Sequence, residues 1–325
     1  KVNDALSSDT FDNYIEALDP GRYYFLAADI AEFEGYRYEL DNALRRGDLL
    51  PAYHMFNRLQ KRLLERTKYM QRAIDAGLER LDFTTDEVIR IKREKVAWSI
   101  DQATQDDLWN RRLKSQVLSM KLNDKALDEI AETLAKRYRN QQKVALRNRS
   151  EDAFQTFINA FAATFDPHTQ YFSPRTSTNF NINMSLSLEG IGAVLQSDED
   201  ATKIVRLVPA GPADKSGALK PSDIISAVGQ GDAGPMIEVV GWRLDDVVEL
   251  IRGPKESTVR LAVQDADAEN SETKLVTIVR NTIKLEEQAA QASVITVEEG
   301  ESTRRIGVIE IPTVYLDFKG QQERD

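Results

Sequence analysis

The spacing of apolar residues changes once along this chain, and that change constrains the fold more than any other feature. Before about residue 166, apolar side chains recur at intervals of three and four residues, as in the segment 11–18, which is typical of one face of an α-helix. From residue 184 onward they alternate with polar residues or form short runs between glycines, which is typical of β-strands. The sequence therefore predicts a multidomain α+β protein with a helical N-terminal part.

The helical part contains further stripes and boundary signals. Residues 33–44 and 56–74 carry apolar residues at helical spacing and are each followed by a glycine. The run Thr84-Thr85-Asp86-Glu87 matches a capping box and predicts a helix start, and Ser150 followed by two acidic residues predicts another. The aromatic stripes could line a cofactor pocket, but core packing already explains their spacing.

Composition excludes several classes of protein. Lys and Arg total 43 against 53 Asp and Glu, a net charge of −10 that argues against a nucleic-acid partner. The chain has no cysteine and two histidines, which excludes thiolate nucleophiles, iron–sulfur clusters and multi-histidine metal sites. We expect no cofactor and no metal. No apolar run approaches the roughly 18 residues that a membrane-spanning helix needs.

A glycine-rich turn at Gly190-Ile191-Gly192 allows three interpretations. A dinucleotide site built on G-x-G-x-x-G would need a third glycine, and position 195 is leucine. Alternatively, the turn leaves backbone N–H groups free to hold the terminal carboxylate of a peptide, while the neighbouring strand adds the peptide as a further strand. The third interpretation is a plain tight turn.

Two other motifs are weak. Ser271 and Lys274 match S-x-x-K, but we expect them at a solvated hairpin tip, where the lysine is not desolvated enough to activate a serine. Asp265, Asp267 and Glu269 are spaced like calcium ligands, but the glycine and the final glutamate of a calcium-binding loop are missing. A solvated acidic loop explains them better.

The segment 208–228, Val-Pro-Ala-Gly-Pro-Ala-Asp-Lys-Ser-Gly-Ala-Leu-Lys-Pro-Ser-Asp-Ile-Ile-Ser-Ala-Val, resembles the core of a bacterial PDZ domain. The predicted helix 242–251 resembles the helix that lines the peptide groove of that fold. The resemblance implies β-augmentation by a ligand and an apolar pocket, in which we expect Leu244 to be the most exposed helix residue and Val248 to belong mainly to the core. The residues that it assigns to peptide binding are Glu189, Gly190, Ile191, Gly192, Ala193, Val194, Leu244, Val247 and Val248.

The resemblance extends over essentially the whole chain. The runs 165–175, 184–195 and 241–248 together resemble the tail-specific protease branch of the C-terminal processing peptidases, and residues 19–22 and 63–69 are similar to the helical domain of that family. The resemblance implies a PDZ domain that recognises apolar C-terminal tails and gates a Ser–Lys protease. It also implies a periplasmic location, with or without association with the inner membrane, and a tetratricopeptide-repeat lipoprotein adaptor as partner.

These inferences predict four regions. Residues 1–165 form the helical domain, 166–185 a hinge or linker, 186–285 the PDZ domain, and 286–325 the first strand or strands of a truncated α/β protease core. Because the strand at 306–312 matches the opening strand of that core, we expect the catalytic serine and lysine to have no counterpart here. We therefore expect the recognition and gating portion of a periplasmic serine endopeptidase. The alternatives are a non-catalytic PDZ adaptor and, less favoured, a cytosolic nucleotide enzyme.

Overall fold

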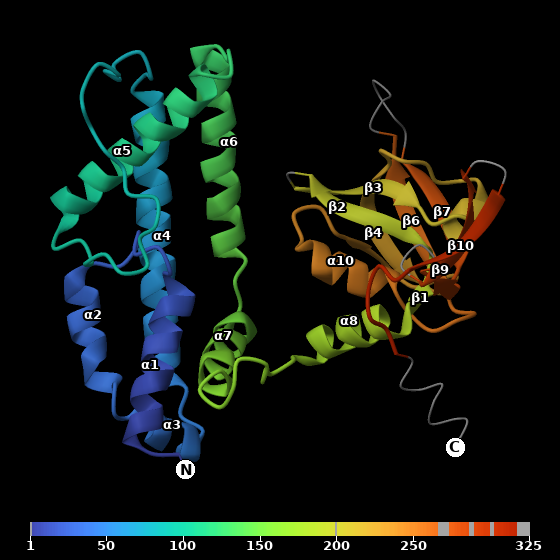
Figure 1. The fold of residues 1–325 in the computed structure, drawn as a ribbon, viewed down its shortest axis with the longest axis horizontal. Coiled ribbons are helices and arrows are strands. Elements are labelled where there is room, and N and C mark those ends of the chain that lie inside the picture. Colours follow the sequence, from blue (N-terminus) through green and yellow to red (C-terminus); the bar gives the residue numbers. More distant parts are fainter. Residues whose placement is uncertain (1, 199, 266–272, 286–288, 300–301, 317–325) are drawn as a thin grey trace. The chain divides into compact units, whose positions relative to one another are not determined.

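The computed structural model describes residues 2–198, 200–265, 273–285, 289–299 and 302–316. The chain divides into two compact units after Ser173 (Figure 1). None of the described helices combines the length and the apolar character that crossing a bilayer requires. The first unit is helical and the second is rich in strands, as expected for the multidomain α+β class.

The first unit is organised around the long helix α4, which packs against α5, α6 and α7, while α1 packs against α3 and α7. Two hydrophobic clusters fill it, one containing Phe11, Tyr14 and Phe157 and the other containing Met70 and Trp109. Its elements are α1 (Asp4–Leu18), α2 (Ala27–Phe33), the short 3₁₀ helix η1 (Glu34–Tyr36), α3 (Leu40–Arg46), α4 (Leu50–Asp75), α5 (Gln102–Lys121), α6 (Leu127–Leu146) and α7 (Ser150–Ala162).

The helical stripes predicted from the sequence correspond to these elements, except that one stripe is divided among several elements and one predicted helix start is wrong. The apolar residues of segment 11–18 are buried on one side of α1, as predicted. The stripe 33–44 is not one helix, because it is divided among α2, η1 and α3. The predicted helix start at Thr84 is wrong. The Thr84 N–H donates to the carboxylate of Asp82 (2.9 Å), which closes a local turn in place of a helical one, and the next helix begins at Gln102.

The second unit begins with helix α8 (Pro174–Ser185), which lies within the segment predicted as a linker. A sheet of six strands follows, with the order β2-β3-β4-β6-β7 and β5 paired to β4. Two separate antiparallel pairs join β1 to β8 and β9 to β10. The elements are β1 (Ser187–Gly190), β2 (Ala193–Asp198), β3 (Ala201–Leu207), α9 (Pro212–Ser216), β4 (Ile224–Gln230), β5 (Met236–Glu238), α10 (Leu244–Ile251), β6 (Thr258–Gln264), β7 (Lys274–Val279), β8 (Asn281–Lys284), β9 (Gln291–Glu299) and β10 (Ser302–Glu310).

The core of the second unit lies between the sheet and its two short helices α9 and α10. Alternate residues of β6 and of the first half of β4 are buried, which is the period of two expected when one face of a strand is covered. Ala213 of α9 and Val247 of α10 complete the same cluster. The strand predicted at 306–311 is present as the main part of β10.

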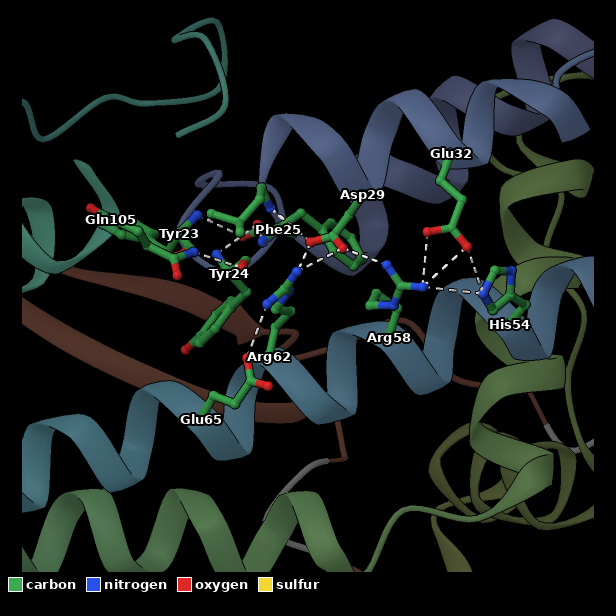
Figure 2. Close-up of polar contacts among 12 residues, drawn as sticks. Tyr23, Tyr24, Phe25, Asp29, Glu32, His54, Arg58, Arg62, Glu65 and Gln105 are labelled. Atoms are coloured by element: carbon green, nitrogen blue, oxygen red, sulfur yellow. Dashed lines mark hydrogen bonds and ion pairs between the residues drawn. The ribbon is translucent and has the colours of Figure 1, made fainter. Parts of the chain in front are cut away.

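A buried carboxylate joins α2 to α4 in the first unit (Figure 2). The side chain of Asp29 is 1% exposed and accepts hydrogen bonds from Arg62 Nε (2.8 Å), Arg58 Nη1 (2.5 Å) and the Leu26 N–H (2.9 Å). Burial by itself raises the pKa of Asp29, but these hydrogen bonds outweigh it and hold the pKa below its ordinary value. The ionised carboxylate is therefore the form that stabilises the fold.

Replacing this carboxylate tests its contribution. We expect Asp29→Asn to lower the free energy of unfolding by about 2–4 kcal/mol, because it leaves two guanidinium groups at a half-buried site without their shared anion. The matched control is Glu32→Gln, which removes a 47% exposed carboxylate from Arg58 and should cost less than about 1 kcal/mol. Urea denaturation measures the free energy of unfolding of both variants. Equal losses of stability would contradict the larger contribution that is assigned to Asp29.

The same carboxylate predicts the direction of a pH dependence. Because the pKa of Asp29 is lower in the folded chain, its contribution is present above the ordinary Asp pKa of about 4 and is lost as the pH falls through the folded value. The stability of Asp29→Asn should therefore depend less on pH below about 5 than that of the unaltered chain.

Candidate functional site

The strand β2 lies at one end of the six-stranded sheet. Among the described strands it pairs with β3, starting from the partners Ala193 and Leu207, and a β-bulge interrupts the register between Val194 and Leu195. Figure 1 shows α10 alongside this sheet, and α10 contacts both β2 and β4. The outer edge of β2 thus offers backbone donors and acceptors that a further strand could pair with.

Helix α10 presents two faces. Val247 is 0% exposed and Ile251 is also buried, so both belong to the hydrophobic core. Leu244 and Val248 are half-buried and lie four residues apart, which places them on a common face of the helix. The expectation that Leu244 is partly exposed agrees with this, whereas the core residue is Val247 and not Val248.

The turn between β1 and β2 directs its carbonyl groups into the protein. The Ile191 carbonyl accepts from the Ala213 N–H (2.7 Å) and the Gly192 carbonyl from the Val208 N–H (2.8 Å). Gly192 has a φ of +76°, a conformation that favours glycine, and a Cβ there would stand 3.4 Å from the Gly211 Cα. In the described part of the chain, neither the Ile191 nor the Gly192 N–H donates to a protein acceptor. Two donors are therefore available at the start of the edge strand.

The structure distributes the predicted peptide-binding residues over four places. Glu189 and Gly190 lie in β1, paired with Thr282 and Asn281 of β8, and the Glu189 carboxylate accepts from the Lys255 N–H (3.2 Å). Ile191 and Gly192 form the turn, Ala193 and Val194 begin β2, and Leu244, Val247 and Val248 belong to α10. Without a bound ligand, the assignment of these residues to peptide binding stays a prediction.

A buried cation fixes the end of α10. Arg280 is 2% exposed and donates to the last carbonyls of the helix, those of Leu250 (3.0 Å) and Ile251 (2.8 Å). It also donates to the side chains of Gln230 (2.7 Å) and Ser257 (2.9 Å). Burial lowers the pKa of Arg280, but arginine remains charged in water at any ordinary pH, and a cation at a helix C-terminus is favourable. The sequence gives no sign of this role.

A second arginine missed by sequence reasoning stands beside the glycine turn. A Cβ at Gly190 would lie 3.8 Å from Cγ of Arg252, which directly follows α10. The guanidinium of Arg252 donates to Asn179 of α8 (2.7 Å), and Arg175 of α8 pairs with Asp246 of α10 (2.8 Å). Helix α8 is therefore tied both to α10 and to the residue that follows it, and the aliphatic part of the Arg252 side chain lies beside the turn.

The described residues contain no group of three or more acidic or histidine side chains that could hold a metal ion. Ser271 of the S-x-x-K motif lies outside the described residues, as do Asp267 and Glu269 of the acidic loop.

The two faces of α10 predict different costs of truncation. Val247→Ala should lower the free energy of unfolding by about 1–3 kcal/mol, because it leaves a cavity in a closed core. Leu244→Ala and Val248→Ala should each cost less than about 1.5 kcal/mol, because a half-buried side chain leaves no closed cavity. Thermal and urea denaturation of the three variants checks the order. A larger loss for Leu244→Ala than for Val247→Ala would show that the two faces are assigned the wrong way round.

Both units match the models of known protein families. Residues 1–175 match the family model of the tail-specific protease N-terminal domain, and residues 179–264 match that of the PDZ domain. The chain is 39% identical over 317 residues to the tail-specific protease of Haemophilus influenzae, an alignment that covers 97% of this chain and 44% of that protein. It is 28% identical over 185 residues to a probable CtpA-like serine protease of Staphylococcus epidermidis, covering 55% of this chain and 34% of the relative.

Two solved structures also resemble it. One is the PDZ domain of the carboxy-terminal protease from Vibrio cholerae in complex with peptide, at 52% identity over 31% of this chain and 100% of that chain, with a TM-score of 0.30. The other is the photosystem II D1 C-terminal processing protease, at 20% identity over 61% of this chain and 49% of that chain, also with a TM-score of 0.30.

The chain spans less than half the length of the curated relatives that it matches. The N-terminal domain match nevertheless covers more than half of this chain, and a PDZ domain follows it in sequence. On this evidence the chain belongs to the tail-specific protease family.

Proposed function

We propose that this chain is the substrate-recognition portion of a periplasmic C-terminal processing serine protease, and that its PDZ domain binds proteins by their apolar C-terminal tails. The family membership favours this function over a non-catalytic PDZ adaptor. The proteolytic activity of the whole protein is part of the proposal, because the chain spans 44% of the Haemophilus relative.

The observation that carries the proposal is the arrangement of the turn at Gly192. Its carbonyls are bonded inward while the N–H groups of Ile191 and Gly192 remain available, and the edge strand β2 starts at the next residue. Neighbouring backbone N–H groups of this kind form a concavity that suits an anion. A peptide that pairs with β2 would place its terminal carboxylate there.

The preference for apolar tails follows from α10. Leu244 and Val248 keep part of their apolar surface exposed on the helix beside β2. Alternate side chains of an added strand point to the same side, so those of the peptide would meet this face. Backbone hydrogen bonds then supply affinity for any extended tail, and the apolar contact supplies selectivity.

The first test compares two peptides that differ in one group. A fluorescein-labelled hexapeptide that ends in valine should bind, and its C-terminal amide should bind more weakly by about 1–3 kcal/mol, because amidation removes the charge that the free N–H groups receive. Fluorescence anisotropy or calorimetry measures both affinities. Equal binding of the acid and the amide would contradict the role of the Gly192 turn.

The second test separates the apolar face of α10 from the core. Leu244→Ala should weaken binding of the free-acid peptide by about 0.5–1.5 kcal/mol and should also reduce the discrimination against a peptide that ends in lysine. The matched control is Val247→Ala, which should lower stability and leave the affinity of the folded fraction nearly unchanged. An affinity loss confined to Val247→Ala would contradict the proposed contact face.

Location and delivery complete the proposal. We place the protein in the periplasm, with a tetratricopeptide-repeat lipoprotein as a partner that delivers substrates. The full-length protein should appear in the osmotic-shock fraction of the cells that produce it, and crosslinking in those cells should retrieve such a lipoprotein. Recovery of the protein from the cytosol alone would exclude both parts.

A further inference from the structure

A large open cavity lies in the helical unit, away from the PDZ domain in the sequence. Its volume is about 780 Å³, and its walls come from the C-terminal half of α4, the turn that follows it, and the first half of α5. Five basic side chains line it, against two acidic ones. The basic residues are Arg62, Arg66, Lys68, Arg72 and Arg80. This local excess of positive charge stands out in a chain whose net charge is −10.

The basic residues differ in whether their charge is already paired with a carboxylate of the chain. Arg62 is committed to Asp29 and Glu65, as Figure 2 shows, and Arg66 is paired with Asp106. Arg80 donates to backbone carbonyls at the end of α4, which leaves its charge without a carboxylate partner in the described structure.

Lys68 and Arg72 are the two cations most accessible to a ligand. Both are exposed, and in the described part of the chain no carboxylate lies within ion-pair distance of either. They are four residues apart on α4 and therefore stand about 6 Å apart along the helix axis. Alternate residues of an extended peptide are spaced by about 6.6 Å and point to the same side. Acidic residues at every second position of a peptide would thus match this pair of cations.

The remaining walls favour a peptide over a polyphosphate or a nucleic acid. Glu65 and Asp106 repel phosphates and peptide carboxylates alike, but a peptide also brings backbone N–H groups from which these carboxylates can accept hydrogen bonds, and a polyphosphate does not. The ring of Tyr69 lies 4.8 Å from the Arg66 guanidinium, and its hydroxyl donates to Asn110 (3.0 Å). Tyr69 is thereby held as a fixed, partly apolar wall against which a peptide side chain can pack.

We propose that this cavity, which we name the α4–α5 cleft, binds an extended acidic segment of a protein, with carboxylates at alternate positions seated on Lys68 and Arg72. The site is built from residues of the helical unit and does not require a free C-terminus. It would give the chain a second point of contact with a protein that presents both an acidic segment and an apolar tail, and two linked contacts raise affinity beyond either one.

The test uses a peptide without a free C-terminal carboxylate, so that the proposed PDZ site cannot hold it by that group. Fluorescein-labelled Glu-Ala-Glu-Ala-Glu-Ala-Glu with an amidated C-terminus is titrated with the chain at about 100 mM salt, and a peptide of the same composition with its glutamates in one block serves as comparison. We expect the alternating peptide to bind more tightly than the block peptide. Lys68→Gln combined with Arg72→Gln should weaken its binding at least about fivefold, the scale of two exposed ion pairs.

The matched control changes the net charge equally at another surface. Lys92 and Lys95 are exposed and do not line the cleft, so Lys92→Gln combined with Lys95→Gln should leave the affinity within about twofold. Circular dichroism and melting confirm that both double variants are folded.

Several results would overturn the proposal. They are no binding of the alternating peptide up to about 1 mM, equal losses in the two double variants, or equal affinity for the block peptide. Tighter binding of single-stranded DNA or inorganic polyphosphate at the same residues would reassign the cleft to another ligand class. Failure of the PDZ domain to distinguish acid from amide peptides would leave this result unaffected, because the probe carries no free carboxyl terminus.

Discussion

The geometry of the candidate peptide site depends on the guanidinium of Arg280. This buried cation receives no carboxylate partner in the described structure and is instead surrounded by neutral acceptors, among them the final carbonyls of α10. An apolar residue there would leave those carbonyls without donors, which costs more than the bonds themselves contribute. Because α10 supplies the apolar face beside β2, the position of that face is fixed at the C-terminal end of the helix and not at the face that is proposed to meet a ligand.

The helical unit uses buried charge in a comparable way, with the sign reversed. The carboxylate of Asp19 is buried and accepts the N–H groups of Tyr23, Tyr24 and Phe25, so one side chain shapes the turn that leads to α2. Burial raises the pKa of Asp19, although those N–H groups favour its ionised form. Asp29 then fastens α2 to α4 through arginines. In both units, charged side chains at the junctions between elements fix the orientation of one element relative to the next, which apolar packing alone does not determine.

The sequence predicted those features that depend only on a few neighbouring residues. The helical spacing of segment 11–18 and the glycine turn at 190–192 were both predicted, because period and left-handed backbone are properties of a few neighbouring residues. The prediction failed at Thr84, where the carboxylate of Asp82 accepts from both the N–H and the hydroxyl of Thr84 and holds this residue in a local turn. Arg280 and Arg252 could not be predicted, because their partners come from distant segments and a lone arginine shows no sequence sign of burial.

The shortness of β2 and its polar end have a consequence for solubility and for selectivity alike. An uninterrupted edge strand would template pairing with any extended chain, including another copy of the protein. The strand β2 is only 6 residues long, and it ends in the exposed polar residues Gln196, Ser197 and Asp198. Such an edge gives a long strand no extended ladder, so the same shortness that would suit the last few residues of a peptide in the proposed site also disfavours edge-to-edge pairing between copies.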